Sequence, residues 1–559
     1  MTDMLAGYRF GAAWDEVYTP DGTPRPTYGG MHEALTAAGP EVLSSLAAFL
    51  ATVFRDQGIT FDHEGVERPF PLDIVPRIIT AAEWDVVERG VAQRVRALEA
   101  FLDDVYGSGL VFRDGVVPRQ MVVSSEHFHR QAFGIRPPNG VRVHVSGIDL
   151  VRDEEGEFRV LEDNLRTPSG VSYVVENRRA LARVLPELFG GHLVRPVAGY
   201  PARLLAALRA AAPPGAEDPT IVVLTPGVYN AAYSEHTLLA RQMGVQLVEG
   251  RDLSVVGNEV RIRTTRGHQR VDVIYRRVDD EFLDPVQFRA DSMVGSPGLL
   301  NAARAGNVTL ANAVGNGVAD DKLIYTYVPD LIRYYLSEEP VLRNVETWRL
   351  DTAENIAQVL SNLGDLVLKP VDGSGGKGIV IGPQATDDEL ATLREAVEAN
   401  PRGYVAQRPV RLSTVPTLIG DQLAPRHVDL RPFAVNDGRE VWVLPGGLTR
   451  VALPEGSLIV NSSQGGGSKD TWVLASPAAP TAAAEADTVA PGESSAVLAG
   501  SDLTEPEADL PAGAGAPGLG DHVDGRRPLA VPPDLGPSEP PREQQQQQQQ
   551  LRRQGRDAC

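Results

Sequence analysis

A lysine followed by a run of small residues separates two apolar stretches between Leu366 and Gly382. Lys369 closes the first stretch, and four of the six positions from Gly373 to Gly378 are glycine. Glycines let backbone N–H groups approach an anion closely, and the lysine adds a positive charge. The pattern predicts a loop that binds phosphate groups between two strands.

Three kinds of phosphate-binding loop compete for this segment. Gly373-x-Gly375-x-x-Gly378 fits the dinucleotide fingerprint formally, but that motif requires a following helix, and Ile379-Val-Ile is typical of a strand. A Walker loop requires Ser or Thr after Gly-Lys, where this chain has Gly378. We therefore expect a glycine flap that closes over a triphosphate, with an ordinary glycine-rich hairpin as the alternative.

Three oxygen-bearing side chains far upstream of the flap form a candidate magnesium site. Asp149 lies on one predicted strand, and Glu162 and Asn164 lie on the next. Residues i and i+2 of a strand point to the same face, so Glu162 and Asn164 would present two oxygens together, with Asp149 opposite. Mg²⁺ prefers oxygen ligands of this kind. A solvated acidic cluster near a turn is the alternative.

Several strings together resemble the ATP-grasp enzymes. Lys322, Lys369 and the flap resemble the nucleotide-binding half, in which two lysines reach the α- and β-phosphates, and the strand ending at Gln407 resembles the hinge that contacts adenine. Asp149 and Glu162-x-Asn164 have the spacing of magnesium ligands in peptide-forming members. The matching strings are residues 147–151, 161–170, 224–230, 369–376 and 461–472.

The order of these strings is reversed, because the magnesium ligands usually follow the flap. A circular permutation accounts for this order. Over about residues 15–474 the chain therefore resembles the circularly permuted ATP-grasp type 2 family, which is related to glutathionylspermidine synthase. One departure is Gly147, where those synthases place an arginine. Arg166 or Arg431 could supply the missing charge, and the departure argues against glutathione and spermidine as substrates.

The resemblance implies an ATP- and Mg²⁺-dependent ligase that joins a carboxylate to an amine through an acyl phosphate, on a small molecule or a peptide. Partner proteins encoded nearby are also expected. The implied site comprises Lys322, Lys369, Gly373, Ser374, Gly375, Gly376 and Gln407 for the nucleotide, Asp149, Glu162 and Asn164 for the metal, and Arg431, Arg166 and Arg450 for catalysis. An ATP-binding scaffold or sensor without turnover, and an ATP-grasp phosphotransferase, are the alternatives.

The expected fold is α/β, a circularly permuted α+β ATP-grasp with a doubly wound substrate domain. Thr80-Ala-Ala-Glu83 predicts a capped helix start, and Gly-rich residues near Ser468 and Lys469 suggest a second closing loop. The predicted divisions are a mostly helical region (1–110), a sheet-rich metal-binding part (111–195), a Rossmann-like domain (196–315), a nucleotide-binding part (316–474) and a disordered tail (475–559).

Other polar residues could line the substrate pocket. Tyr229, Asn230, Glu235, His236, Arg276 and Arg277 follow strands of the Rossmann-like domain, where ligands gather. His127 and His129 alternate on a predicted strand, but with no third ligand nearby we expect no metal role for them.

Composition narrows the class of protein. The net charge of −21, without a basic stripe, argues against nucleic-acid binding. The single cysteine, Cys559, excludes a disulfide framework and a thiolate metal cage. The first residues lack the order of a signal peptide, and we find no apolar span of about 18 residues, so we expect a cytoplasmic protein without a membrane helix.

Overall fold

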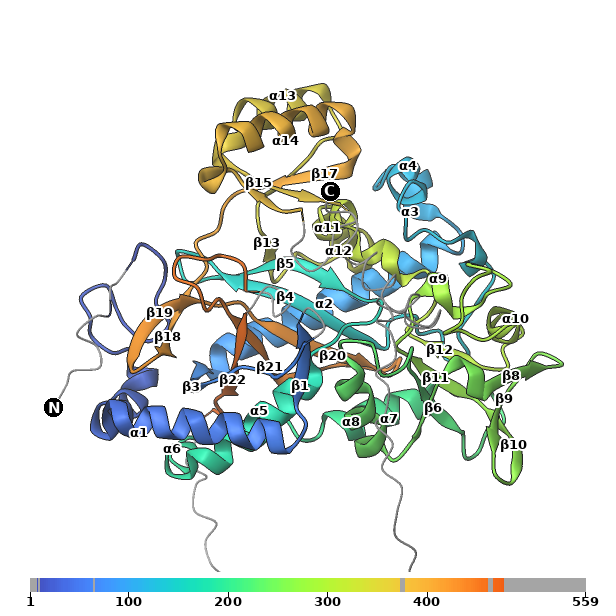
Figure 1. Ribbon diagram of the computed structural model, residues 1–559. Helices are drawn as coiled ribbons and strands as arrows, with labels where there is room; N and C mark the ends of the chain where they lie inside the picture. Colours follow the sequence, from blue (N-terminus) through green and yellow to red (C-terminus); the bar gives the residue numbers. More distant parts are fainter. Residues whose placement is uncertain (1–7, 9–10, 64–65, 372–377, 461–465, 477–559) are drawn as a thin grey trace, which may run out of the picture. The chain divides into compact units, whose positions relative to one another are not determined.

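The computed structural model describes residues 8, 11–63, 66–371, 378–460 and 466–476. A seven-stranded mixed sheet dominates these residues (Figure 1). In spatial order its strands are β13 (Arg343–Asn344), β5 (Phe158–Asn164), β4 (Val145–Arg152), β20 (Arg431–Asn436), β21 (Val441–Val451), β22 (Gly467–Val473) and β3 (Leu72–Ile79). Strand β4 pairs antiparallel with β5 on one side and with the much later β20 on the other. Early and late segments thus share one sheet, as expected of a permuted chain.

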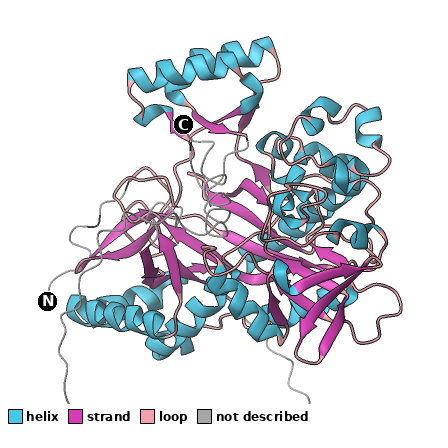
Figure 2. Ribbon diagram, turned by 45° about the vertical axis from the view of Figure 1, so that its right-hand side comes forward, coloured by secondary structure: helices cyan, strands magenta, loops and turns pink. Residues whose placement is uncertain are grey.

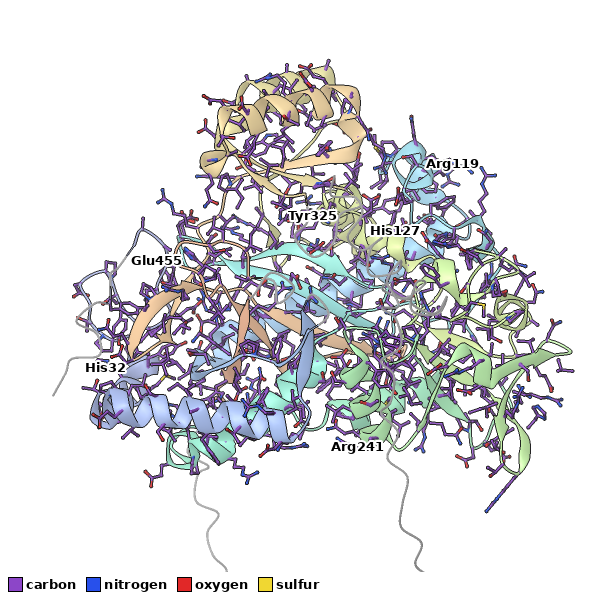
Figure 3. The ribbon with its side chains drawn as sticks, viewed as in Figure 1. His32, Arg119, His127, Arg241, Tyr325 and Glu455 are labelled. Carbon is purple, nitrogen blue, oxygen red and sulfur yellow. The ribbon has the colours of Figure 1, made fainter. Side chains whose placement is uncertain are left out.

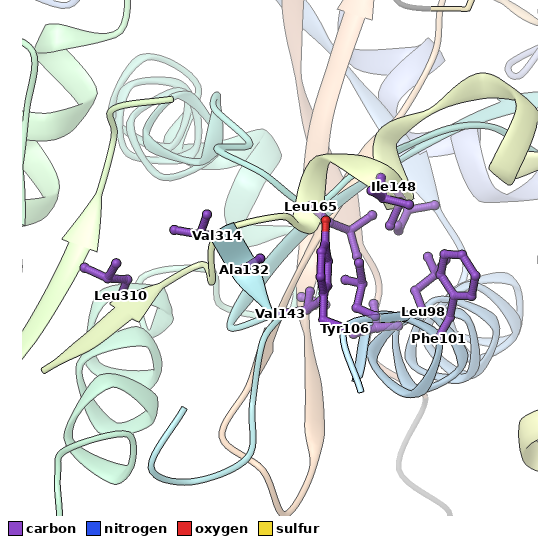
Figure 4. Packing of buried hydrophobic residues seen from close by; sticks show 14 of the residues in the cluster. Leu98, Phe101, Tyr106, Ala132, Val143, Ile148, Leu165, Leu310 and Val314 are labelled. Carbon is purple, nitrogen blue, oxygen red and sulfur yellow. The ribbon is translucent and has the colours of Figure 1, made fainter. Parts of the chain in front are cut away.

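Helices cover both faces of this sheet. Helix α2 (Ala81–Val105) belongs to the same apolar core as Ile148 and Leu165, and Figure 4 shows its Leu98 and Phe101 in this core. Helices α1 (Gly29–Asp56) and α5 (Val171–Val184) belong to the core on the opposite face, with Phe433 and Leu444. Side chains of a strand alternate between faces, so a strand buried on both sides supplies both cores.

The predicted capping box starts α2 as expected. The Thr80 hydroxyl accepts a hydrogen bond from the Glu83 amide at 3.3 Å, and the Glu83 carboxylate accepts one from the Thr80 amide at 2.9 Å. Two amides that lack partners at a helix start are satisfied in this way. The signal is local, which explains why it could be predicted from sequence.

A parallel sheet lies beside the central one. Its strands, in spatial order, are β12 (Thr309–Ala311), β11 (Val273–Arg276), β6 (Ile221–Leu224) and β7 (Gln246–Val248). Helix α8 (Tyr233–Met243) connects β6 to the parallel β7, which gives the predicted β-α-β unit. The hairpin strands β8 (Leu253–Val256), β9 (Glu259–Thr264) and β10 (Gly267–Val271) form a separate antiparallel sheet, and α7 (Tyr200–Ala210), α9 (Asp280–Leu283) and α10 (Leu299–Arg304) complete this region.

A small antiparallel sheet carries the segment around the flap. Its strands are β14 (Thr347–Arg349), β17 (Tyr404–Gln407), β15 (Val367–Pro370) and β16 (Val380–Ile381). Helices α13 (Ala353–Ser361) and α14 (Asp387–Ala399) lie together on one side of it (Figures 1 and 2). Strands β15 and β16 pair antiparallel on either side of the flap, as predicted. Residues 372–377 of the flap, including Gly373, Ser374, Gly375 and Gly376, lie outside the described residues.

One predicted element assignment was wrong. Residues 110–132, expected in a sheet, form the short helices α3 (Leu110–Arg113) and α4 (Arg119–Val123) and a 3-10 turn at Arg130–Ala132, so His127 and His129 lie on a loop. Helices α1 and α2 make up most of the region expected to be mostly helical, which also contains strand β3 and the hairpin β1 (Thr60–His63) and β2 (Val66–Pro69). Most of β3 is buried, so it lacks the alternation that identifies a half-exposed strand.

One helical stretch, Pro26–Asp56, is long and apolar enough to cross a membrane by length and composition alone, which the sequence analysis did not anticipate. Gly39, with a φ of 73°, and Pro40 interrupt its helical geometry. Its buried residues, among them Leu43 and Leu50, belong to the same core as the central sheet. The apolar character of this stretch is thus used partly in packing. The remaining elements are α6 (Pro186–Gly190), α11 (Lys322–Tyr325), α12 (Val328–Leu336), β18 (Thr414–Ile419) and β19 (Gln422–His427).

Candidate active site

Strands β4 and β5 bring together the three predicted metal ligands. Asp149 stands opposite Glu162 in the ladder, and Asn164 stands opposite Gly147. The register shifts directly after Asp149, so the pair at Asp149 is the last before an irregularity in the ladder. Asp149 is buried, whereas the side chain of Glu162 is 31% exposed. Two carboxylates and an amide therefore meet on one pair of strands.

Asp163, between these ligands, points to the other face. Arg94 of α2 grips its carboxylate with two hydrogen bonds, from Nε at 2.5 Å and from Nη2 at 2.7 Å. Burial raises the pKa of Asp163, and the Arg94 guanidinium opposes this rise. The alternation of side chains along β5 thus gives Asp163 a structural ion pair and leaves Glu162 and Asn164 for the site.

Two arginines hold Asp149. Arg431 donates from Nη2 to Oδ2 at 2.7 Å and also from Nε to Oδ1, and Arg450 donates from Nη2 to Oδ2 at 2.8 Å. Burial alone would raise the pKa of Asp149, but the two guanidinium groups outweigh it and lower the pKa to about 2. Asp149 is therefore charged at neutral pH, and both of its oxygens already accept hydrogen bonds.

Arg450 also binds a second carboxylate. Its Nε donates to both oxygens of Asp429 at 3.0 Å, and Nη2 donates to the same group. Burial raises the pKa of Asp429, and Arg450 counters this effect. Asp429 thus pairs with Arg450 and not with Arg431, which is nearer in sequence. The result is a compact network of two aspartates and two arginines.

Arg431 lies beside Gly147, the position at which the chain lacks the arginine of the related synthases. Strand β20 runs beside β4, and a Cβ atom on Gly147 would stand 3.1 Å from Cδ and 3.4 Å from Cγ of Arg431. Such contacts are tighter than ordinary van der Waals separations, so a side chain at position 147 would compete with Arg431 for space. The guanidinium that reaches Asp149 thus comes from the neighbouring strand.

Arg166, the other candidate, has different partners. Its Nε donates to Asp320 at 3.0 Å, and Asp320 also accepts from the Leu165 amide at 2.6 Å. Burial raises the pKa of Asp320 to about 6, although Arg166 opposes the shift. A Cβ atom on Gly317 would lie 2.7 Å from Cδ of Arg166 and 2.8 Å from Cβ of His127, so this glycine permits close packing of both side chains. Arg166 fixes the loop that follows β5.

The two predicted phosphate-binding lysines lie around Glu162. Lys322 begins α11, which Asp321 caps, and its ammonium lies 3.1 Å from the Glu162 carboxylate. Burial lowers the pKa of Lys369 to about 8, Glu162 opposes the fall, and the charge of Lys322 adds to it. Two ammonium groups that disfavour each other are stabilised when an anion binds between them. The arrangement suits phosphate oxygens.

Gln407 has a structural partner. It ends β17 between β14 and β15, and its side-chain amide donates to the Thr347 hydroxyl at 3.0 Å. The side chain is thereby committed to the sheet. Adenine recognition at this hinge would therefore rely on backbone groups of β17.

The donor set fits a divalent cation in part. In the part of the chain that the structure describes, no group of three or more His, Cys, Asp or Glu residues could hold a metal ion. Glu162 offers a partly exposed carboxylate, and the buried amide nitrogen of Asn164 has no hydrogen-bond partner among the described residues. That amide is free to turn its oxygen toward a cation, which suits Mg²⁺. At Asp149 a cation would compete with two guanidinium groups for the carboxylate oxygens.

The structure gives several suggested substrate residues a structural role. Glu235 accepts hydrogen bonds from the backbone amides of Gly170 and Ser172, and Arg277 donates to Glu235 and to the Pro168 carbonyl. These bonds join the parallel sheet to the start of α5. Arg276 donates to backbone carbonyls, and His236 contacts Thr225, whereas Tyr229 exposes about half of its surface. Asn230 accepts a hydrogen bond from the Ala232 amide.

The suggested second closing loop is a core strand. Lys469 is fully buried on β22, where its ammonium binds Asp73 and donates to the carbonyls of Pro416 and Val75. Strand β22 lies between β21 and β3, and this pairing turns the Gly-rich pattern into sheet. The expectation was therefore wrong for Ser468 and Lys469, and residues 461–465 lie outside the described residues.

His127 is a neighbour of the site that sequence reasoning set aside. Burial lowers the pKa of His127 well below its usual value, and the charges of Arg166, His129 and Lys322 lower it further. Figure 3 shows His127 and Tyr325 in the same region of the structure, and the Tyr325 hydroxyl donates to the Val160 carbonyl of β5 at 2.6 Å. Arg166 and Lys322 come from distant segments, so the local sequence could not place His127 beside the site.

Comparison with known proteins identifies the family. A family model described as circularly permuted ATP-grasp type 2 matches residues 76–452. The chain belongs to this family. Membership of an ATP-grasp family implies dependence on ATP and a divalent cation, and it supports an ATP-dependent ligase. The permuted ATP-grasp fold expected from the sequence is thereby confirmed.

Relatives and structures agree with the family. An uncharacterized protein of Mycobacterium tuberculosis is 61% identical over 486 residues, which cover 86% of this chain and 88% of that protein. A Frankia casuarinae protein named "Putative glutamate--cysteine ligase 2-2" is 48% identical over 464 residues, 82% of this chain and 53% of its own length. A glutathione synthetase-like effector of Globodera pallida has a similar fold, with a TM-score of 0.52 at 13% identity, covering 78% of this chain and 98% of its own.

Proposed function

We propose that this circularly permuted ATP-grasp protein is an ATP- and Mg²⁺-dependent carboxylate–amine ligase that forms an amide or peptide-like bond on a small molecule or a peptide. The observation that carries the proposal is the cluster of Lys322, Lys369 and Glu162 beside Asp149 and Asn164. It combines two phosphate-binding cations with oxygen ligands for a metal. The name of the Frankia relative supports ligase chemistry, but the match covers 53% of that protein, so the substrates stay open.

Each residue has a defined task in this scheme. Lys322 and Lys369 would bind the phosphate oxygens of ATP, and Glu162, Asn164 and Asp149 would hold Mg²⁺. The bound cation would offset the negative charge of the phosphates. An oxygen of the substrate carboxylate attacks the γ-phosphorus, and the bond to the bridging oxygen breaks, releasing ADP. The amine then attacks the acyl phosphate, loses a proton and displaces inorganic phosphate.

Arg431 is the best candidate for stabilising charge on the transferred phosphoryl group. It reaches the site from β20 over Gly147, and its planar guanidinium can grip two oxygens at once. Arg450 would instead hold Asp149 in place, because it is anchored on Asp429. Arg166 would shape the neighbouring loop through Asp320. Of the three arginines, these contacts favour Arg431 for the catalytic role.

The test is a product search. Purified protein with Mg-ATP and mixtures of amino acids and peptides should release ADP and phosphate, and mass spectrometry should find condensation products that have lost one water. Hydroxylamine should trap the acyl phosphate as a hydroxamate. The Glu162→Ala variant should bind Mg-ATP weakly. Absence of ADP release with every mixture, together with unchanged Mg-ATP binding by Glu162→Ala, would contradict the ligase.

An ATP-binding scaffold without turnover is the second candidate. The observation that favours it is Asp149, whose oxygens are both occupied by arginines. Tight ATP binding without hydrolysis under any substrate would support this alternative. A phosphorylated small molecule or enzyme, found by mass spectrometry in place of an amide, would point to a phosphotransferase.

We also propose a cellular location and partners for this protein. We expect a cytoplasmic enzyme that works with partner proteins encoded nearby. The Frankia relative supports a partner, because its matching region makes up about half of a longer chain. Affinity purification of the tagged full chain from its own cells, followed by mass spectrometry, tests this expectation.

A further inference from the structure

The two arginines that bind Asp149 are anchored differently. Arg450 contacts two carboxylates, Asp149 and Asp429, and only 9% of its side chain is exposed. Arg431 contacts a single carboxylate, that of Asp149, and otherwise donates to the Ser169 carbonyl at a longer 3.3 Å. Of the two, Arg431 has fewer bonds to break. Arg431 alone contacts Oδ1 of Asp149, so its departure would free that oxygen, whereas Arg450 stays anchored on Asp429 even if its single bond to Asp149 breaks.

The charges within the network of Asp149, Asp429, Arg431 and Arg450 are balanced. Asp149 and Asp429 carry two negative charges, and Arg431 and Arg450 carry two positive ones. A divalent cation bound to Asp149 would compete with the guanidinium groups for the same oxygens and would repel them. Repulsion between buried like charges is costly because little solvent screens it. The less anchored Arg431 would then move toward a negative partner.

Gly147 makes the position of Arg431 possible. A Cβ atom at this position would approach both Cδ and Cγ of Arg431 closely, and it would also lie 3.3 Å from Cβ of Pro168. Because Gly147 has no side chain, the aliphatic part of Arg431 can pass over it from β20 to reach Asp149 on β4. Gly147 and Arg431 thus function as a matched pair.

We propose that Arg431 blocks Asp149 until a divalent cation displaces it, so that cation binding and release of the catalytic arginine are one event. The inference rests on the proposed function and adds a control to it. Without the cation, Arg431 stays on Asp149. With the cation, Arg431 is free to contact the phosphoryl group. Phosphoryl transfer is thereby coupled to a complete metal site.

Manganese binding tests the proposal without knowledge of the substrates. Mn²⁺ affinity of the full chain, with ADP present, can be followed by electron paramagnetic resonance. Arg431→Ala should bind Mn²⁺ at least several-fold more tightly than the original chain, because the competitor for Asp149 is gone. Arg431→Lys, which keeps the charge but lacks the planar fork, should gain part of this affinity. Gly147→Ala, which crowds the stem of Arg431, should shift affinity in the same direction.

Controls separate the possible results. Arg266→Ala, on the exposed turn between β9 and β10, removes a remote charge and should leave Mn²⁺ affinity unchanged. If Arg431→Ala gains affinity while Arg431→Lys matches the original chain, loss of charge alone explains the gain and the blocking role is overturned. Unchanged or weaker binding by Arg431→Ala overturns it as well. Gly147→Ala keeps the test valid if Arg431→Ala folds poorly.

Failure of the proposed blocking role can be distinguished from failure of the proposed ligase activity. A chain that binds Mn²⁺ and ADP but forms no condensation product contradicts the ligase, and the comparison of Arg431 variants still stands. A chain whose Glu162→Ala variant loses Mn²⁺ binding, while Arg431→Ala shows no gain, contradicts only the blocking role. A chain that binds no Mn²⁺ with ADP overturns both.

Discussion

The arginine–aspartate network on the central sheet and the lysine cluster beside the small sheet differ in charge balance. In the network, two carboxylates match two guanidinium groups, and hydrogen bonds join them. In the cluster, Lys322 forms an ion pair with Glu162, and the charges of Glu162 and Asp149 act on Lys369. The charges of the first region balance without a ligand, whereas the second region has two ammonium groups that an anion could bridge. The difference indicates that stability is concentrated in the network and affinity for anions in the cluster.

Removal of Arg450 should have the largest effect on stability. The Arg450→Met variant leaves Asp429 without its guanidinium partner and weakens the hold on Asp149, and breaking a buried ion pair costs about 3–5 kcal/mol. The midpoint of urea denaturation should fall clearly. Arg439→Ala, at an exposed position, is the control and should leave the midpoint unchanged. Equal midpoints for both variants would remove the contrast between the two regions.

Removal of Lys369 should act on nucleotide affinity instead. Hydrogen bonds to charged groups contribute about 1.5–3 kcal/mol, so Lys369→Met should weaken Mg-ATP binding about 10–100-fold. The melting temperature should stay the same or rise, because a partly buried cation beside Lys322 is lost. Isothermal titration calorimetry and thermal melts measure the two effects. A lower melting temperature with unchanged affinity would reverse the assignment of the two regions.

Nucleotide binding should also take up a proton in alkaline solution. Without an anion, the pKa of Lys369 is about 8, so part of the population loses its charge above that pH. Bound phosphate favours the charged form and raises the pKa. Below pH 8 affinity should be nearly constant, and above pH 8 it should fall as protonation becomes costly. Calorimetry in buffers of different ionisation enthalpy measures the uptake, which Lys369→Met should abolish.

Gln407 should show the smallest effect. Its side chain bonds Thr347 in the sheet, so Gln407→Ala should reduce stability by about 0.5–1.5 kcal/mol, the contribution of one hydrogen bond. Mg-ATP affinity should change less than about threefold. A much larger loss of affinity would mean that this side chain leaves Thr347 and contacts the nucleotide.

Local signals explain which features the sequence could predict. The capping box at Thr80, the strands around the flap and the i, i+2 pair of Glu162 and Asn164 each depend on residues close together in the chain. Partners across the sheet could not be predicted in this way. Arg431 meets Asp149 across 282 positions, and a nearby Asp429 was an equally good candidate on sequence grounds. The order of the strands in the sheet determines that Arg431 contacts Asp149 and not Asp429.

Pairing between distant strands also explains why the prediction for Lys469 was wrong. A lysine after a run of glycines is typical of an exposed loop, yet strand pairing with β3 buries it against Asp73. At His127 the error is the opposite one. No role in the site was expected for it, yet the charged residues Arg166 and Lys322, which are distant in sequence, act on it. In both cases tertiary contacts override the local preference of the residue.

The pairing of β3 with β22 has a consequence for biosynthesis. Lys469 and Asp73 are 396 positions apart, so the ribosome must complete nearly the whole catalytic region before β3 acquires its neighbour. Until then the unpaired backbone N–H and C=O groups along β3 are a site for wrong pairing, and contacts between such distant residues form slowly. Newly made chains should therefore depend on chaperones until β22 emerges, and truncation before Gly467 should yield aggregates, not a smaller enzyme.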